Sequence, residues 1–102
     1  MMGWVYILKC SDGTYYTGST IDLKQRISEH KSGNGANYTK KRLPIELVYF
    51  EEHTRIDSAY QREKQIQNWS KKKKEALIKG GKKNIKDATK ESNVNSKEKR
   101  RS

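Results

Sequence analysis

The sequence predicts a small α/β (α+β) domain, with a three-stranded antiparallel sheet flanked by helices in the order β-β-α-β-α-α. Near the N-terminus, apolar and polar residues alternate on both sides of a turn signal, which is typical of a β-hairpin. Apolar residues then recur at helical spacing in later segments, on either side of one further β-branched and aromatic run. At 102 residues the chain has room for one domain with a modest core.

The hairpin is predicted from residues 4–10 and 14–19, joined by Ser11-Asp12-Gly13. The length of this loop decides where two tyrosines point. A two-residue turn would place Tyr6 and Tyr16 on opposite faces of the hairpin, whereas a three-residue loop makes them diagonal neighbours on one face. We predict one face, because a shared site requires it.

A helix is predicted to follow Gly18, where the second strand ends and the backbone is expected to pass close to another group. Leu23 and Ile27 are four residues apart and are expected to pack on the sheet. Arg26 and His30 share the same spacing on an adjoining face, which we expect to be available for function. The candidates for the N-cap of this helix are Asp22 and, alternatively, Ser19 or Thr20.

Residues 32–44 are predicted to form a loop, because Gly, Asn and Lys dominate their composition. Exposed Tyr38 and the run Lys40, Lys41 and Arg42 would suit a phosphate backbone with a base stacked nearby. A charged, solvated loop is an equally good interpretation. The third strand is predicted over residues 45–50, and because it is apolar on both faces we expect it to be the central or best-covered strand.

The second long helix is predicted to begin near Thr54 and carries a carboxylate among apolar residues. Glu63 falls inside the apolar stripe, where a charge is costly unless it is paired or binds a metal. Two interpretations stay open: a functional carboxylate, or a glutamate that swings to the edge of the stripe and pairs with a lysine. A third helix is predicted over residues 71–79, ended by Gly80-Gly81. The stripe consists of Ile56, Ala59, Tyr60, Ile66 and Trp69.

The chain is strongly basic, with a formal net charge of +11 from 23 Lys and Arg against 12 Asp and Glu. Residues 80–102 hold eight basic, three acidic and only three apolar residues. We therefore expect an ordered domain over residues 1–79 and a basic, disordered tail over residues 80–102. The charge favours a polyanionic partner, of which nucleic acid is the commonest, over a purely solubilising role.

Cysteine content and hydropathy indicate the compartment. Cys10 is the only cysteine, so an intrachain disulfide is excluded, and we expect a small buried side chain there. The longest apolar run, Trp4 to Leu8, is too short for a signal peptide or a membrane span. The sequence therefore predicts a soluble, cytoplasmic protein.

Several classes of site are excluded by their motifs. The chain has two histidines and one cysteine, too few for a Cys/His zinc site, and it lacks both a GxxxxGK phosphate loop and a serine nucleophile elbow. The remaining polar side chains fit phosphodiester hydrolysis. A carboxylate can hold a hydrated Mg²⁺, and an arginine can brace the charge that develops on a phosphate. A tyrosine, with a free pKa of about 10, can align or deprotonate water if another group assists.

Two short motifs in the predicted hairpin also match those of a known protein family. Val5-Tyr6-Ile7 and Tyr16-Thr17-Gly18 resemble the paired motif of the GIY-YIG nuclease superfamily, with valine for the first glycine and threonine for the isoleucine. Arg26, His30 and Glu63 stand where that family places functional residues. The resemblance covers residues 3–79 and is closest to the small stand-alone bacterial single-domain subgroup. Fragments that suggest this subgroup include Asn37-Tyr38-Thr39 and Glu63-Lys64-Gln65-Ile66.

The resemblance implies a role for each residue. Tyr6 and Tyr16 would line the site, one of them as the general base or the group that positions water. Arg26 would stabilise the phosphate, and His30 would support a tyrosine or the proton path. Glu63 would bind the metal ion, Mg²⁺ or Mn²⁺. The family does not agree on which tyrosine is the base, and the sequence leaves this open.

The sequence therefore predicts a metal-dependent DNA endonuclease-type phosphodiester hydrolase, with DNA repair or recombination suggested by family association alone. Many family members carry an asparagine well after the metal-binding glutamate; Asn68 is too close to Glu63 to receive that role. The main alternative is a non-catalytic DNA- or RNA-binding module that retains the fold, and a third is a protein-interaction adaptor. Glu63→Ala should abolish cleavage by a nuclease, whereas a binding module should depend on residues 40–42 instead.

Overall fold

The computed structural model of this protein describes the backbone of residues 1–90 and the side chains of residues 1–80. The order of its elements confirms the predicted α+β fold, and adds a one-turn helix, α2, inside the segment predicted as a loop. The strands are β1 (Gly3–Lys9), β2 (Tyr15–Thr20) and β3 (Glu46–His53), and the helices are α1 (Leu23–Lys31), α2 (Asn37–Lys40), α3 (Ile56–Gln67) and α4 (Lys71–Lys90).

Strands β1 and β2 form an antiparallel hairpin with a three-residue loop, in which Gly13 takes a positive φ of +85°. In this register Tyr6 lies opposite Gly18, and Leu8 lies opposite Tyr16. Tyr6 and Tyr16 are therefore diagonal neighbours on one face of the sheet, with ring centroids 6.4 Å apart. The predicted loop length and the shared face are both confirmed.

The central strand is β1, because the strand order is β2-β1-β3. The expectation that the third strand is central is wrong. Its apolar character on both faces has another cause: Tyr49 packs into the core beneath α3, whereas Leu47 packs into the core beneath α1. The pairing of β1 with β3 shifts register here, because Ile7 lies opposite Tyr49 whereas Leu8 lies opposite Leu47. This irregularity interrupts the alternation of side chains between the two faces.

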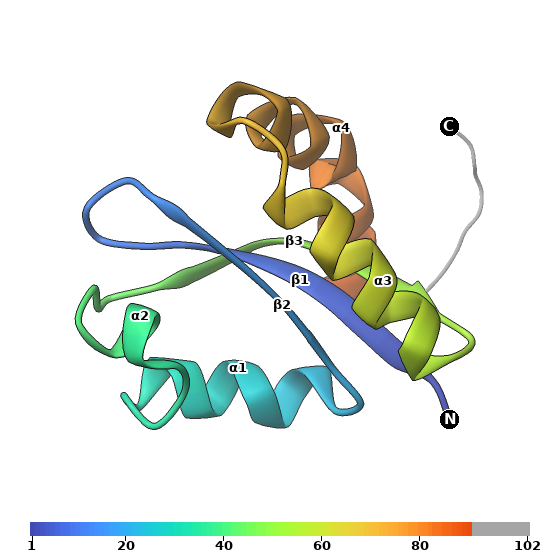
Figure 1. Ribbon diagram of the computed structural model, residues 1–102, viewed down its shortest axis with the longest axis horizontal. Helices are drawn as coiled ribbons and strands as arrows, with labels where there is room; N and C mark the ends of the chain where they lie inside the picture. The colour runs from blue at the N-terminus through green and yellow to red at the C-terminus, as the bar shows by residue number, and fades with distance from the viewer. Residues whose placement is uncertain (91–102) are drawn as a thin grey trace.

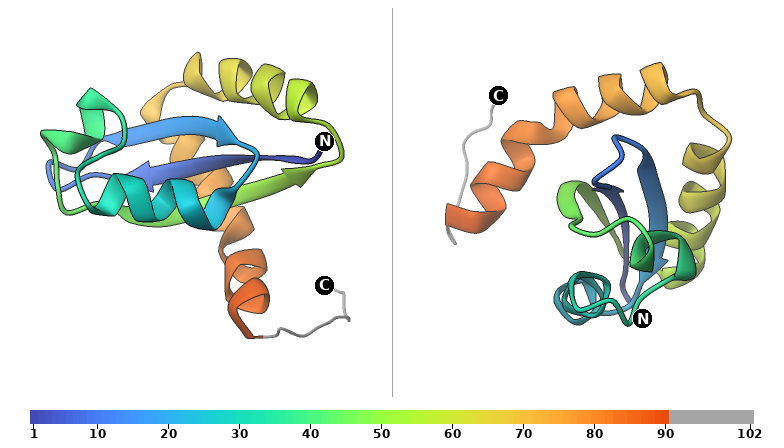
Figure 2. Two further views of the ribbon diagram at one scale, coloured as in Figure 1. Left: turned by 90° about the horizontal axis from the view of Figure 1, so that it is seen from below. Right: turned by 90° about the vertical axis from the view of Figure 1, so that its left-hand side faces the viewer.

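The sheet separates two helical layers, with α3 and α4 over one face and α1 and α2 against the other (Figure 1 and Figure 2). Each face of the sheet buries its own apolar cluster, and successive side chains of β1 belong to the two clusters in turn. Tyr60, predicted to lie in the apolar stripe of α3, is instead 53% exposed. The α3 side buries Val5, Ile7, Tyr49, Ala59 and Ile66, and the α1 side buries Tyr6, Leu8, Cys10, Ile27 and Ile45.

Helix α1 begins as predicted, since the side chain of Asp22 accepts a hydrogen bond from the Gln25 N–H at 3.1 Å. Ile27 is buried against the sheet and Arg26 stays partly exposed. His30, however, is fully buried, so the expectation that it lies on an available face is wrong. Its ring is enclosed between the sheet and the segment that leads into α2.

Helix α4 continues to Lys90, so the prediction that Gly80-Gly81 ends it is wrong. A glycine in an exposed helix costs only roughly 1 kcal/mol relative to alanine, and good helix formers surround this pair. Residues 80–90 continue α4, and residues 91–102 lie outside the described part of the chain. The domain boundary at residue 79 and the disorder of the tail beyond Lys90 therefore stay predictions. No helix of the described residues is long and apolar enough to cross a membrane.

Thr17 carries a buried hydroxyl without a hydrogen-bond partner among the described residues. It stands where the resemblance places isoleucine, on the face that Ile7 shares. Since an unpaired buried hydroxyl is unfavourable, Thr17→Val should raise the free energy of unfolding by about 1 kcal/mol, measured by urea denaturation. Thr39 is equally buried but hydrogen-bonded, so Thr39→Val should lower it. A loss of stability in Thr17→Val would contradict this account.

Candidate active site

The candidate site lies at the free edge of β2, and Gly18 makes it possible. A Cβ atom at Gly18 would stand 2.5 Å from the hydroxyl oxygen of Tyr6 and 2.6 Å from its Cζ. The phenol of Tyr6 therefore crosses directly over the backbone of Gly18 toward the sheet edge. The predicted close approach at this glycine is confirmed.

Two tyrosines and a histidine form one aromatic cluster on the α1 side of this edge. The ring centroid of His30 lies 5.6 Å from that of Tyr6 and 5.3 Å from that of Tyr16. A hydrogen bond of 2.9 Å joins the Tyr6 hydroxyl to Nε2 of His30. The structure thus brings together three of the predicted residues, two from the hairpin and one from α1.

The electrostatics of this cluster are governed by burial. Burial raises the pKa of Tyr6 to about 12, although the guanidinium of Arg26 beside it opposes the rise. Burial also lowers the pKa of His30 to about 4, and the charge of Arg26 adds to this effect. Both groups are therefore neutral at neutral pH. Arg26 itself forms a 3.0 Å ion pair with Glu29 at the surface of α1.

Glu63 reaches the same edge from the opposite face of the sheet. Its Oε1 accepts a 2.5 Å hydrogen bond from the Ser19 hydroxyl, and its Oε2 accepts one of 2.7 Å from the side-chain amide of Gln67. The same amide also donates to the carbonyl oxygen of Thr17 at 3.1 Å. Glu63 is close enough to Tyr6 for its charge to contribute to the raised pKa of that phenol. The site therefore wraps around the edge of β2.

One sequence interpretation, a functional carboxylate at residue 63, stays a prediction. The other, a pairing of Glu63 with a lysine, does not describe the surroundings of Glu63. Glu63 does move to the edge of the apolar stripe, but in the described part of the chain its partners are Ser19 and Gln67, not a lysine. Sequence reasoning missed these two residues. Gln67 lies one helical turn beyond Glu63, and Ser19 faces α3 because Val5 lies opposite it on β1, so both could have been found from periodicity.

Comparison with known proteins identifies this arrangement. The family model described as "GIY-YIG catalytic domain" matches residues 2–76. The chain belongs to the GIY-YIG family. The resemblance drawn from Tyr6, Tyr16 and the residues that follow them is confirmed.

Relatives of this GIY-YIG chain are themselves small. A UPF0213 protein of Halobacterium salinarum is 46% identical over 77 residues, which is 76% of this chain and 100% of the relative. A UPF0213 protein of Staphylococcus epidermidis is 44% identical over 78 residues, which is 76% of this chain and 95% of the relative. These lengths agree with the predicted single-domain subgroup.

Two solved structures share the fold. The solution NMR structure of a UPF0213 protein from Bacillus halodurans has 38% sequence identity and a TM-score of 0.56, covering 92% of this chain and 100% of that one. The solution NMR structure of a protein from E. faecalis has 27% identity and a TM-score of 0.50, covering 95% and 96% of the two chains.

The GIY-YIG site offers a divalent cation few protein ligands. Among the described residues no three His, Cys, Asp or Glu side chains gather into a metal-binding group. Glu63 is a single carboxylate beside a hydroxyl oxygen, and none of the described lysines or arginines forms a salt bridge with it. Mg²⁺ is commonly held by one or two carboxylates with waters and substrate phosphates, so these residues fit such an ion.

The loop predicted to bind nucleic acid is partly occupied with contacts inside the GIY-YIG domain. The ring of Tyr38 stacks on Tyr16 with centroids 6.0 Å apart, and its hydroxyl donates to Thr14 at 2.7 Å. The guanidinium carbon of Arg42 lies over the Tyr38 ring, 3.8 Å from its centroid. The prediction that Tyr38 is exposed is therefore wrong, because its side chain is partly buried and packs against Tyr16. Only Lys40 and Lys41 of the predicted binding residues are fully exposed.

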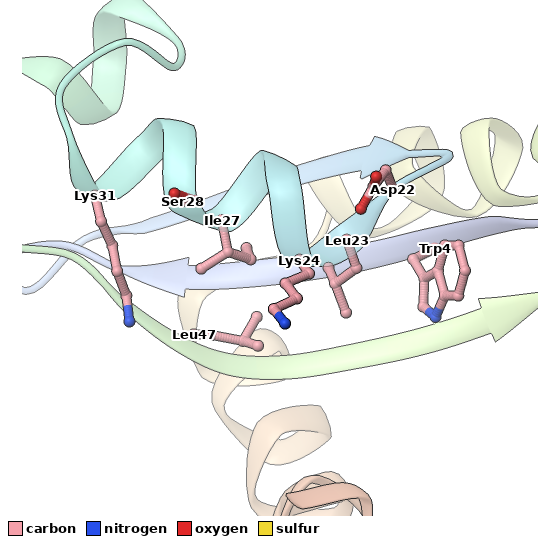
Figure 3. A pocket seen from close by; sticks show the side chains of 8 residues that line it. All are labelled: Trp4, Asp22, Leu23, Lys24, Ile27, Ser28, Lys31 and Leu47. Atoms are coloured by element: carbon pink, nitrogen blue, oxygen red, sulfur yellow. The ribbon is translucent and has the colours of Figure 1, made fainter.

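Two cavities lie near α1, and only one touches a candidate residue. A cavity of about 390 Å³ next to Arg26 is also lined by Thr20, Gln25 and Glu29. A second, of about 620 Å³, lies between α1 and β3 with Leu47 on its floor, and none of the five candidate catalytic residues lines it (Figure 3).

The buried neutral His30 should make this GIY-YIG domain sensitive to acid. Its pKa is about 4 when folded and about 6.5 when unfolded, so the unfolded chain binds more protons between these values. The stability contributed by neutral burial is complete above pH 6.5 and is lost as the pH falls through 4. It amounts to at most about 3 kcal/mol. Urea unfolding at several pH values in this window measures the loss.

The matched comparison is between the two histidines. His30→Gln should flatten the pH dependence of stability in this window, whereas His53→Gln, at a partly exposed position, should leave it steep. Equal slopes in the wild-type chain and His30→Gln would show that His30 is not the group responsible.

Proposed function

We propose that this protein is a divalent-metal-dependent nuclease that hydrolyses phosphodiester bonds of DNA, as an endonuclease acting in repair or recombination in the cytoplasm. The observation that carries the proposal is the convergence at one sheet edge. The hydrogen-bonded pair Tyr6 and His30 arrives from one face, and Glu63 arrives from the other. Membership of the GIY-YIG family supports a nuclease-type reaction.

The two tyrosines and His30 would orient and deprotonate the attacking water. A phenol with a pKa of about 12 is not ionised at neutral pH, so Tyr6 cannot take a proton from water without giving up its own. His30 lies 2.9 Å away and is neutral, so it can receive that proton. The ring of Tyr16 lies beside the same pair, and its hydroxyl would orient the water.

Arg26 and Glu63 would stabilise the phosphate, Arg26 directly and Glu63 through a bound cation. The guanidinium of Arg26 lies next to Tyr6 and can donate hydrogen bonds to the charge that develops on the phosphate oxygens, once Glu29 releases it. Glu63 and Ser19 would hold the cation. A bound Mg²⁺ or Mn²⁺ supplies a positive charge that stabilises the phosphate and the leaving oxygen. Exposed lysines at residues 40–41 and 71–73 would bind the DNA backbone weakly and in a salt-dependent way.

The test is incubation of the purified chain with labelled single-stranded, duplex and branched DNA, with Mg²⁺, with Mn²⁺ and with chelator. We expect cleavage only when metal is present. Tyr6→Phe removes one buried hydroxyl and keeps the ring, and it should lower the cleavage rate by about 100-fold.

Two outcomes would count against the proposal. Cleavage that Tyr6→Phe leaves unchanged would indicate a contaminating nuclease. Binding without cleavage on every substrate and with either metal would indicate a non-catalytic binding module, in which substitutions at Lys40 and Lys41 weaken binding while Tyr6→Phe has no effect.

A further inference from the structure

Thr39 lies directly behind His30, in a segment that the proposed chemistry leaves without a role. Its side chain is fully buried, and its Oγ1 stands 2.8 Å from Nδ1 of His30. The same hydroxyl donates to the carbonyl oxygen of Ala36 at 3.0 Å. The one-turn helix α2 therefore ends in contact with the ring nitrogen that Tyr6 does not use.

The hydrogen atoms available fix the direction of each bond. A threonine hydroxyl has one hydrogen, and the Thr39 hydrogen is committed to Ala36. The oxygen of Thr39 can then only accept a hydrogen from Nδ1 of His30. A neutral imidazole carries a single N–H, so its Nε2 has a lone pair and accepts the hydrogen of the Tyr6 hydroxyl.

The surroundings of the Tyr6 hydroxyl indicate independently that Nε2 of His30 is the acceptor. Arg26 also lies next to the Tyr6 hydroxyl, but a guanidinium only donates hydrogen bonds, so it cannot accept the Tyr6 hydrogen. Among the described residues, Nε2 of His30 is therefore the one acceptor for the Tyr6 hydrogen. With the proton on Nε2, that hydrogen would have no partner in a buried position, which is unfavourable.

The loop before α2 is shaped to hold the ring in this position. A Cβ atom at Gly35 would stand 2.8 Å from Cγ of His30 and closer still to Nδ1. The backbone of Gly35 thus lies directly against the imidazole, and any side chain there would push the ring out of place. The orientation of His30 is fixed by the loop, by Thr39 and by Tyr6 together.

We propose that Thr39 is a positioning residue that keeps His30 in the tautomer protonated on Nδ1, so that Nε2 is free to accept the proton of Tyr6. In the other tautomer Nε2 would donate to Tyr6 and could not take its proton. The catalytic consequence rests on the proposed nuclease function, whereas the tautomer itself does not.

The tautomer can be measured directly in the full chain by long-range ¹H–¹⁵N NMR with ¹⁵N-labelled histidine, which distinguishes protonated from unprotonated ring nitrogens. His53, the only other histidine, serves as an internal reference. We expect the Nδ1–H form of His30 in the wild-type chain, in Thr39→Ser and in Tyr6→Phe. In Thr39→Val, which removes the hydroxyl and keeps the shape, we expect the Nε2–H form to appear.

An Nε2–H form in the wild-type chain or in Tyr6→Phe would overturn the proposal, and so would an unchanged tautomer in Thr39→Val. If Thr39→Val does not fold, the wild-type chain and Tyr6→Phe still decide the question. On DNA, Thr39→Val should lower kcat about 100-fold with little change in KM, and Thr39→Ser should restore it. Absence of cleavage by the wild-type chain would refute the nuclease function while the NMR result on the tautomer stands.

Discussion

Glu63→Gln is expected to lower the rate of metal-dependent cleavage by about 1000-fold, because several kcal/mol of transition-state stabilisation come from the cation that Glu63 would hold. Glutamine keeps an oxygen that can accept the hydrogen bond from Ser19, but it loses the negative charge. The free energy of unfolding should therefore change by less than about 1 kcal/mol. Single-turnover cleavage across a Mn²⁺ titration measures the first effect, and urea denaturation measures the second.

The matched control is Glu52→Gln, an exposed glutamate on β3 at the far edge of the sheet. It removes the same charge from the whole molecule, so it should change long-range attraction of DNA equally while leaving cleavage near the wild-type rate. Comparable loss in both variants would show that net charge, and not a metal ion held at Glu63, causes the effect.

Gly18→Ala is expected to cause the largest combined loss of stability and activity. The added methyl would stand 2.5 Å from the Tyr6 oxygen and 3.2 Å from Cε2 of Tyr16, and the Tyr6 side chain is almost completely buried. Overpacking of this kind costs about 1–3 kcal/mol. Displacement of Tyr6 would also break its hydrogen bond to His30, so cleavage should fall by at least about 100-fold.

Gly80→Ala is the control for Gly18→Ala, because a Cβ atom at Gly80 meets no other atom within 4 Å and the residue lies inside α4. It should stabilise the protein by about 0.5–1 kcal/mol. Thermal unfolding of the two variants should therefore shift in opposite directions. A Gly18→Ala variant as stable and as active as the wild-type chain would show that Tyr6 does not depend on the open backbone at Gly18.

The parts of the fold that depend on neighbouring residues were predictable from sequence. The hairpin loop fixes the shared face of Tyr6 and Tyr16 through the two-residue period of a strand, and Asp22 caps α1 with its side chain, which accepts a hydrogen bond from the Gln25 N–H three residues later. These features need no knowledge of distant segments.

The features that sequence did not give depend on distant packing. His30 is buried because Gly35 and Thr39, in a segment without a periodic pattern, fold back over it. Glu63 leaves the core because Ser19, more than forty residues earlier, offers a hydrogen bond at the sheet edge. Periodicity places Ser19 on the face of the sheet that α3 covers, but no local pattern predicts that Gly35 and Thr39 fold over His30. The central position of β1 likewise depends on how the third strand pairs.

The edge position of β2 has a consequence for solubility. An uncovered edge strand is a template on which another chain can add a strand, and proteins that aggregate often do so in this way. Here the side-chain amide of Gln67 donates a hydrogen bond to the backbone carbonyl oxygen of Thr17, and the carboxylate of Glu63 accepts one from the same amide. These side chains at the candidate site thus also oppose the addition of another strand to this edge, so substitutions at Gln67 should be tested for aggregation as well as for cleavage.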